Sequence, residues 1–204
     1  MIAIVDYGLG NVAAFANIYK RLNVPAGAAK TADDLRGASR IILPGVGSFD
    51  QAVDRLTRSG MREPLEEIMH SGGVPVLGVC VGMQMLAACS AEGRLPGLGW
   101  VPGTVKKFDV STLGDMKALP HMGWNDVKPA TDSKLFDGLG ADARFYFLHS
   151  YYFECAERDH VLAETEYGIR FSSAVSRGNL YGVQFHPEKS HRFGVQLLHN
   201  FASL

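Results

Sequence analysis

The sequence predicts one α/β domain, in which helices cover both faces of a mostly parallel sheet and an antiparallel portion is added. Short apolar runs at residues 1–5, 40–43 and 74–79 alternate with helical patterns, as buried parallel strands do. Beyond Gly93 the sequence changes to closely spaced strand-like segments separated by turns, which favour antiparallel pairing. The 204 residues suffice for a sizeable core, so we expect a single domain over residues 1–204.

Each element follows from the local spacing of apolar residues. Helices repeat their apolar residues every three or four positions, and we expect helices at residues 12–22, 49–58, 62–71, 80–88 and 192–202. The strand-like segments of the second half are residues 100–108, 122–127, 145–153, 161–166, 171–176 and 180–185. No repeat, low-complexity tract or linker interrupts this order, which supports one continuous domain.

Composition and charge exclude several classes of protein. The formal net charge of −1 provides no strong attraction to nucleic acid or to an anionic membrane surface. No apolar stretch is long enough to span a bilayer, and the N-terminal residues lack the pattern of a signal peptide. The cysteines Cys80, Cys89 and Cys155 have no CxxC spacing, and the histidines have no metal-ligand spacing. We therefore expect a cytoplasmic protein with reduced thiols, without a metal or other cofactor.

One cysteine stands at the junction of a predicted strand and a predicted helix, in Gly78-Val79-Cys80-Val81-Gly82. A nucleophile on such a tight turn is presented at the carboxyl edge of the sheet, and the flanking glycines permit a strained backbone. The start of the following helix favours a thiolate, and its free N–H groups, that of Val81 first, can hold an oxyanion. The alternative is a buried structural cysteine beside packing glycines, because G-x-C-x-G is a weak pattern by itself.

A cysteine nucleophile needs a base, and His186 has the most informative surroundings of the histidines, in Phe185-His186-Pro187-Glu188. An apolar strand is expected to end at His186, Pro187 stops that strand, and Glu188 can turn back toward the imidazole. The carboxylate would hold one ring nitrogen so that the other faces Cys80 at the same edge of the sheet. A capping histidine and a solvated glutamate are the alternative roles of these two residues.

With both motifs present, the sequence resembles the class I, triad-type glutamine amidotransferases. Within them it is most similar to the glutaminase subunits of imidazole glycerol phosphate synthase, a family of histidine biosynthesis. The resemblance covers nearly the whole chain through ordered motifs: Asp6-Tyr7-Gly8-Leu9-Gly10-Asn11, Leu43-Pro44-Gly45-Val46-Gly47, Pro120-His121-Met122-Gly123-Trp124-Asn125, His149-Ser150-Tyr151-Tyr152 and His186-Pro187-Glu188-Lys189-Ser190. It implies a flavodoxin-like glutamine amidotransferase type 1 domain, in which a Cys80–His186–Glu188 triad hydrolyses L-glutamine to glutamate and ammonia through a thioester.

The resemblance also implies an oxyanion hole that Val46 and Val81 provide, with Gly45 and Gly47 beside the bound substrate. The two glycines that flank Val46 make rotation of its peptide easy. Two hypotheses follow for this loop. Either the Val46 peptide points away from the site at rest and turns on activation, or the loop is a rigid turn.

Four further residues are implied to bind the substrate glutamine. Gln84 lies one helical turn beyond Cys80 and would contact the substrate in the same pocket. His149, Ser150 and Tyr151 follow an apolar run and would hold the α-amino and α-carboxylate groups. Without the resemblance, Gln84 would be a polar residue on a half-buried helix, and residues 149–151 would be ordinary polar residues at the end of a strand.

The resemblance further implies a heterodimer with a cyclase subunit, a (β/α)8 barrel that receives the ammonia. The expected contact residues are Asn11, Met122, Trp124, Asn125, Tyr146 and Lys189. Tryptophan is enriched as an anchor in protein interfaces. Core packing of Trp124 and a solvated charge at Lys189 are the alternatives.

Three other functions use the same motifs. Another class I glutaminase would serve nucleotide, tryptophan or pyridoxal phosphate synthesis, although the PGVG and PHMGWN stretches disfavour it. A cysteine hydrolase or peptidase on a related fold would act on esters or peptides without preference for glutamine. A phosphate-binding module would use residues 6–11 as a glycine-rich loop, but that loop lacks the G-x-G-x-x-G spacing.

Overall fold

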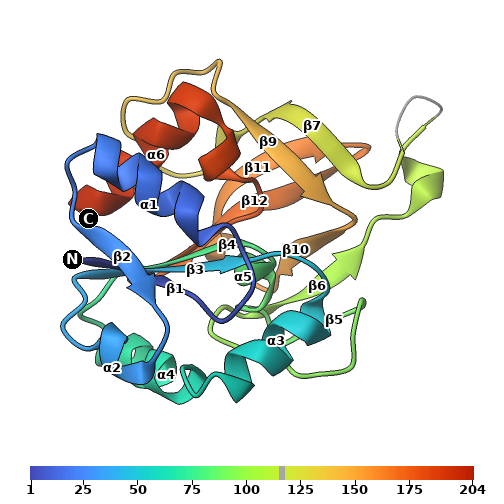
Figure 1. Cartoon of the computed structure of the whole chain (residues 1–204). Coiled ribbons are helices and arrows are strands. Elements are labelled where there is room, and N and C mark those ends of the chain that lie inside the picture. Colours follow the sequence, from blue (N-terminus) through green and yellow to red (C-terminus); the bar gives the residue numbers. More distant parts are fainter. Residues whose placement is uncertain (115–117) are drawn as a thin grey trace.

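The computed structural model describes residues 1–114 and 118–204, which fold around one large mixed sheet and a separate two-stranded sheet (Figure 1). The strands of the large sheet are β1 (Ile2–Val5), β2 (Ala26–Ala29), β3 (Arg40–Gly45), β4 (Val76–Cys80), β5 (Cys89–Ser90), β6 (Gly103–Lys107), β8 (Lys128–Pro129), β10 (Tyr151–Cys155), β11 (Val161–Tyr167), β12 (Ile169–Arg177) and β13 (Leu180–Val183). The two-stranded sheet pairs β7 (His121–Asp126) with β9 (Arg144–His149). The α-helices are α1 (Val12–Arg21), α2 (Ala32–Leu35), α3 (Phe49–Arg58), α4 (Arg62–Ser71), α5 (Val81–Gln84) and α6 (His191–Ser203).

The parallel part of the large sheet runs in the order β2-β1-β3-β4-β13. All residues of β1 and β4 are buried, because helices cover both faces, and this explains their uninterrupted apolar sequences. In Figure 1, α1 and α6 cover one face of this sheet, and α3 and α4 cover the other. The predicted helix-covered parallel sheet is therefore confirmed.

The antiparallel portion continues the same sheet. β12 pairs antiparallel with β13, β10 and β11, and β10 pairs antiparallel with β6. The β7–β9 sheet packs on this portion through aromatic rings, of which Phe147 and Phe171 have centroids 6.1 Å apart at 81°. The antiparallel portion expected in the second half of the chain is thus confirmed, and β13 joins it to the parallel part of the sheet by pairing parallel with β4.

Four elements differ from the sequence-based expectation. The single strand predicted over residues 145–153 is broken at Ser150, so that β9 lies in the small sheet and β10 in the large one. The helix predicted over residues 80–88 is only α5 (Val81–Gln84), because the chain turns and enters the short strand β5. The Ala-Gly-Ala-Ala strand β2 and the short helix α2 were not expected, since neither carries an apolar pattern strong enough to predict it.

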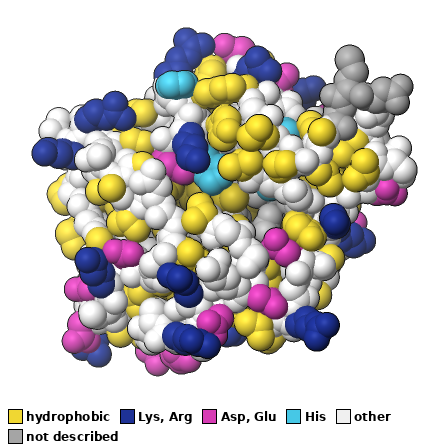
Figure 2. Space-filling model, turned by 45° about the vertical axis from the view of Figure 1, so that its right-hand side comes forward, with side chains coloured by type: hydrophobic (Ala, Val, Ile, Leu, Met, Phe, Trp, Pro, Cys, Tyr) yellow, Lys and Arg dark blue, Asp and Glu magenta, His cyan; other side chains and the backbone are white. Residues whose placement is uncertain are grey.

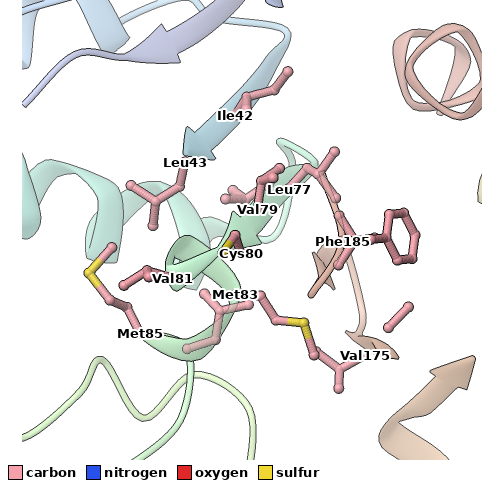
Figure 3. Packing of buried hydrophobic residues seen from close by; sticks show 14 of the residues in the cluster. Ile42, Leu43, Leu77, Val79, Cys80, Val81, Met83, Met85, Val175 and Phe185 are labelled. Atoms are coloured by element: carbon pink, nitrogen blue, oxygen red, sulfur yellow. The ribbon is translucent and has the colours of Figure 1, made fainter. Parts of the chain in front are cut away.

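The core is continuous beneath the junction of β4 and α5. Figure 3 shows Leu43, Val79, Val81 and Met83 packed around Cys80, each contributing a buried side chain. This packing fixes the position of the strand-to-helix turn, because close-packed side chains leave little room for movement. Among the described residues, no helix is long and apolar enough to cross a membrane.

Candidate active site

Cys80 ends β4 with a backbone conformation that side chains rarely adopt, φ 55° and ψ −113°. The glycines around it are required by close backbone approach. A Cβ atom at Gly82 would lie 1.9 Å from the Leu43 carbonyl oxygen, and one at Gly78 would lie 2.7 Å from the Gly82 carbonyl oxygen. Strain of this kind persists only where the surroundings hold it, and it is concentrated at functional sites. The turn therefore has the geometry of a nucleophile elbow.

His186 follows β13, and Glu188 lies in the 3-10 turn Pro187–Lys189 directly after it. The turn brings the carboxylate back onto the ring, so that Nδ1 of His186 lies 2.8 Å from Oε1 of Glu188. Both side chains are buried, at 4% and 3% exposure. Burial lowers the pKa of His186, but hydrogen bonds to Cys80 and Glu188 and the charges of these groups outweigh burial and raise it to about 10. The surroundings thus favour the imidazolium form of His186.

Cys80 and His186 open onto a single cavity of about 310 Å³. That size is in the range of small-molecule sites. The cavity brings together most of the predicted catalytic, oxyanion-hole and substrate residues from well-separated segments: Val46, Gly47, Cys80, Val81, Gln84, His149, Ser150, Tyr151 and His186. Lys189, expected at the interface, also lines it. Glu188 lies behind the lining, where it supports His186.

The loop after β3 approaches the elbow through its backbone. Gly45 pairs with Cys80 across the sheet, and a Cβ atom there would lie 2.4 Å from the backbone nitrogen of Gly82. Gly47 has φ +90°, which favours glycine, and the Val46 side chain is exposed. This arrangement leaves backbone groups of the loop beside the cavity. Rotation of the Val46 peptide stays a hypothesis.

Gln84 ends α5, is buried, and lines the cavity. Its Nε2 donates to the Tyr151 carbonyl at 3.1 Å and to Oε1 of Gln184 at 2.9 Å. Both amide hydrogens are thus engaged inside the protein, and Oε1 of Gln84 is the polar atom left for a ligand in the cavity.

His149 lines the same cavity, but both of its ring nitrogens have partners within the protein. Nδ1 lies 2.7 Å from the Tyr151 carbonyl oxygen, and Nε2 lies 3.0 Å from Nδ1 of His121. Burial and the neighbouring His121 lower the pKa of His149 to about 3, so its imidazole is neutral. The expected contact between this imidazole and the substrate's α-groups is therefore not supported, because no ring nitrogen is left for it. Ser150 and Tyr151 remain candidates for that contact.

Exposed apolar side chains form an outer face on the β7–β9 sheet. Met122 pairs with Leu148 and Trp124 with Tyr146 across the two strands, and Met122 and Trp124 are 65% and 40% exposed. Figure 2 shows hydrophobic side chains gathered on the side of the molecule where these strands lie. Lys189 borders the face, with Nζ 5.8 Å from the Tyr146 ring centroid. A contiguous exposed apolar set of this kind is typical of an interaction surface.

Two other residues expected at the interface are placed differently. Asn125 lies on the inner side of β7, where its Nδ2 donates to the Glu166 carbonyl at 3.0 Å and lies 3.2 Å from Nε2 of His121. Its side chain therefore lies on the opposite side of β7 from Met122 and Trp124, and its place at an interface stays a prediction. Asn11 is exposed and caps α1 by accepting a hydrogen bond from the backbone of Ala14.

Three residues near the thiol were not predicted from the sequence. Glu92 lines the cavity and accepts a hydrogen bond from the backbone N–H of Phe49 at 2.8 Å. Tyr7 donates to the Pro44 carbonyl at 2.7 Å, and burial together with the charge of Cys80 raises its pKa. Gln184 is fully buried, with Nε2 3.8 Å from the Cys80 sulfur. A polar residue inside the apolar strand Tyr-Gly-Val-Gln-Phe was the available signal for Gln184; Glu92 had none.

The structure describes all three cysteines as free thiols. Within residues 1–114 and 118–204, no group of three or more histidine, cysteine, aspartate or glutamate side chains is arranged to hold a metal ion.

The sequence profile of the family described as "Glutamine amidotransferase class-I" matches residues 5–203. The chain is 62% identical to the imidazole glycerol phosphate synthase subunit HisH of Bdellovibrio bacteriovorus and 52% identical to that of Leptospira interrogans, in both cases over the full length of both chains. Among solved structures, PurLQS from Thermotoga maritima is similar with a TM-score of 0.74 at 17% identity. The match covers 99% of this chain and 97% of the PurLQS chain. A structure described as a glutamine amidotransferase has a TM-score of 0.72 at 20% identity over 97% of this chain and 98% of its own.

The two solved structures share the fold, and the profile and the relatives define the family. The mixed sheet, the strained elbow and the cavity occur in a chain whose relatives are alike from end to end. The chain belongs to the class I glutamine amidotransferases and, within them, to the HisH glutaminase subunits of imidazole glycerol phosphate synthase.

Proposed function

We propose that Cys80 hydrolyses L-glutamine to L-glutamate and ammonia, with His186 as the proton carrier and Glu188 as its orienting group. The observation that carries this proposal is the strained elbow cysteine in the same cavity as a buried histidine–carboxylate pair. A nucleophile, a base and an orienting acceptor are the three parts that thiol-based acyl transfer requires.

The reaction proceeds in two halves. The Cys80 thiolate attacks the side-chain carboxamide carbon, and the N–H group of Val81, joined by that of Val46, stabilises the oxyanion. The imidazolium of His186 gives its proton to the leaving nitrogen, so that ammonia departs and a γ-glutamyl thioester remains. A water molecule then loses a proton to His186 and attacks the thioester. Collapse of the second tetrahedral intermediate releases glutamate and restores the thiolate and the imidazolium.

The polar groups of the cavity are suited to a free amino acid. Oε1 of Gln84 and the carboxylate of Glu92 are acceptors for the α-ammonium group of glutamine. Ser150 and Tyr151, which also line the cavity, are candidates to bind its α-carboxylate. Gly45 and Gly47 leave room for the substrate beside the Val46 peptide. An ester or peptide substrate has no use for this set of acceptors, which favours glutamine over the hydrolase alternative.

The ammonia is delivered to a cyclase subunit, a (β/α)8 barrel, in a heterodimer that makes imidazole glycerol phosphate and the aminoimidazole carboxamide ribotide in histidine biosynthesis. The family supports this part of the proposal, since its members are subunits of imidazole glycerol phosphate synthase. The outer face of the β7–β9 sheet, with Lys189 and Asn11, supplies the docking surface. We place the complex in the cytoplasm, where its cysteines stay reduced.

The test is glutamate release from glutamine by the purified chain, alone and then with the cyclase subunit and its ribotide ligand. We expect slow release alone and a strong rise in the complex. In the Cys80→Ala variant, release should fall by more than about 10³-fold while the complex still forms, because the nucleophile is lost and its packing is nearly kept. Glutamate release by Cys80→Ala at the wild-type rate, or none by the wild type in a complex shown to form, would contradict the proposal.

A further inference from the structure

Two buried glutamines connect the substrate cavity to the thiol. Nε2 of Gln84 donates to Oε1 of Gln184 at 2.9 Å, and Nε2 of Gln184 lies 3.8 Å from the Cys80 sulfur, within hydrogen-bond reach of sulfur. Gln184 is 0% exposed and Gln84 is 3% exposed. Burying two primary amides is costly unless their hydrogen bonds are made, so this pair is built into the site.

The orientation of both amides follows from one carbonyl group. Tyr151 O can only accept, so the amide end of Gln84 that lies 3.1 Å from it must be Nε2. The same Nε2 then requires an acceptor at its second contact, which makes the near end of Gln184 its Oε1. Gln184 is left with its Nε2, a donor, pointing to the sulfur of Cys80. A flip of either amide would place like groups together.

That carbonyl is itself held in place from the other side. Nδ1 of His149 donates to Tyr151 O at 2.7 Å, so the Nε2 of the neutral His149 ring accepts from Nδ1 of His121 at 3.0 Å. The sense of every hydrogen bond from His121 to Cys80 is thus determined. The Tyr151 carbonyl accepts from both His149 and Gln84, and from Gln84 onward each bond places its donor toward the thiol. Hydrogen bonds aligned in this way strengthen one another.

We propose that Gln184 is a further catalytic residue, whose side-chain N–H donates to the Cys80 sulfur and stabilises the thiolate. This inference rests on the proposed function. Sulfur accepts hydrogen bonds more strongly as thiolate than as thiol or thioester, so the contact strengthens whenever the sulfur carries negative charge. It favours the nucleophile before attack and the leaving thiolate when the thioester is hydrolysed. Gln84 is the positioning residue that keeps the donor of Gln184 turned to the sulfur.

Other groups near the sulfur have to be separated from Gln184 in the test. The titratable groups that face it are His186 with Glu188 from the turn after β13, Tyr7 from the loop after β1, and His149 from the end of β9. Glu92 lines the same cavity. None of them is changed by substitution of Gln184, so a difference between the wild type and a Gln184 variant reports on the amide.

The experiment measures the rate of Cys80 alkylation by iodoacetamide against pH, with peptide mapping by mass spectrometry, in the wild type and in Gln184→Met. Methionine keeps the length of the side chain and removes the donor. We expect half-maximal alkylation of Cys80 to move up by about 1 pH unit. We also expect kcat for glutamine in the complex to fall about 10-fold with little change in KM, as when a hydrogen bond to a charged group is lost.

The chain provides matched controls for this measurement. Gln196→Met makes the same change on α6, where the amide bonds Asn200 instead of the active site, and should leave both readouts at wild-type values. Cys155, which is partly buried, reports on folding in the same samples, since its alkylation rate rises if the fold loosens, and the exposed Cys89 serves as the reference for reagent reactivity.

A second measurement needs no Gln184 variant. In the wild type, the side-chain amide proton signals of Gln184 should shift with pH at the midpoint of Cys80 alkylation, and they should lose this shift in Cys80→Ser. An unchanged Cys80 alkylation profile in folded Gln184→Met, or amide signals that do not follow the thiol, would overturn the inference. If the wild type failed to hydrolyse glutamine while Gln184→Met still shifted the alkylation profile, the proposed function would fail and the contact with the sulfur would stand.

Discussion

The carboxyl edge of the large sheet and the end of the β7–β9 sheet each bury a histidine beside the same cavity, yet one ring is positively charged and the other is neutral. His186 and His149 are 3% and 6% exposed, so burial is nearly equal. The pKa of His186 is raised to about 10, and that of His149 is lowered to about 3. The partners make the difference: a thiol and a carboxylate for His186, a carbonyl and a second histidine for His149.

The comparison shows that burial alone does not decide the protonation of an active-site histidine. Without a compensating negative charge, burial favours the neutral ring, as at His149. With a carboxylate 2.8 Å from Nδ1, the charged ring is stabilised, as at His186. The first arrangement yields a fixed hydrogen-bond relay, and the second yields a group that can give up and recover a proton during the reaction.

Glu188→Gln makes the surroundings of His186 resemble those of His149 and should have the largest effect. The amide is nearly the same size but has no charge, so the imidazolium loses one of the two groups, Cys80 and Glu188, that raise its pKa. We expect kcat for glutamine in the complex to fall about 10²-fold, with a smaller change in KM. The measurement is steady-state glutamate release by the complex.

Glu67→Gln, the same substitution on the exposed side of α4, is the matched control and should keep the wild-type kcat. A Glu188→Gln complex with the wild-type kcat would mean that the carboxylate only packs against the ring.

The second prediction contrasts the outer face of the small sheet with the core of the large one through the two tryptophans. Trp124 is 40% exposed, whereas Trp100 is 3% exposed. Trp124→Ala should weaken binding of the cyclase subunit by about 10-fold or more and cost little stability, since truncated anchors at interfaces carry much of the binding energy. Trp100→Ala should lower the free energy of unfolding by about 3–5 kcal/mol instead.

Calorimetric titration of the cyclase subunit and urea unfolding distinguish the two variants. The docking role of Trp124 would be wrong if its replacement lowered stability as much as that of Trp100 and left binding unchanged.

The smallest expected effect is on the pH dependence of the free energy of unfolding, to which the two histidines contribute with opposite sign. The folded pKa of His149 lies below its ordinary value of 6.5, so the unfolded chain binds the proton first and stability falls as the pH drops from 6.5 toward 3. The folded pKa of His186 lies above 6.5, so its contribution is complete below pH 6.5 and is lost as the pH rises toward about 10. His149→Gln should remove a stability loss of about 1.4 kcal/mol per pH unit on the acid side.

Urea unfolding at several pH values between 5 and 9 measures both the loss of stability below pH 6.5 and the loss above it. The His149→Gln variant should keep the decline above pH 6.5 that His186 causes. An acid limb as steep in this variant as in the wild type would assign the titration to another group.

The sequence predicts the fold best where burial is complete. β1, β3 and β4 are buried on both faces, and their apolar runs identify them. β2 was missed because Ala-Gly-Ala-Ala has low strand propensity, and pairing with β1 alone makes it a strand. The break at Ser150 could not be predicted, because the apolar pattern runs on through β9 and β10 while the chain changes from one sheet to the other.

In the candidate site, too, residues within local motifs were predicted, and roles that depend on distant contacts were not. Cys80 and the His186–Glu188 pair lie in short motifs with a local physical reason, so the sequence alone points to them. Nε2 of His149 is engaged by His121, 28 residues away, and this contact could be found only in three dimensions. Glu92 reaches the cavity through its contact with Phe49, 43 residues away, and has no local signal of any kind.

Strand β9 separates the outer face from the thiol by the thickness of one backbone. Tyr146 and Leu148 present side chains to the outside, while the Tyr146 carbonyl accepts the His186 N–H at 2.8 Å and the Leu148 carbonyl lies 4.0 Å from the Cys80 sulfur. Any force on these two side chains is therefore passed to the peptides that border both His186 and Cys80. If the outer face is the docking surface, as we propose, a bound partner would lie one backbone away from the sulfur and could shift these carbonyl groups directly.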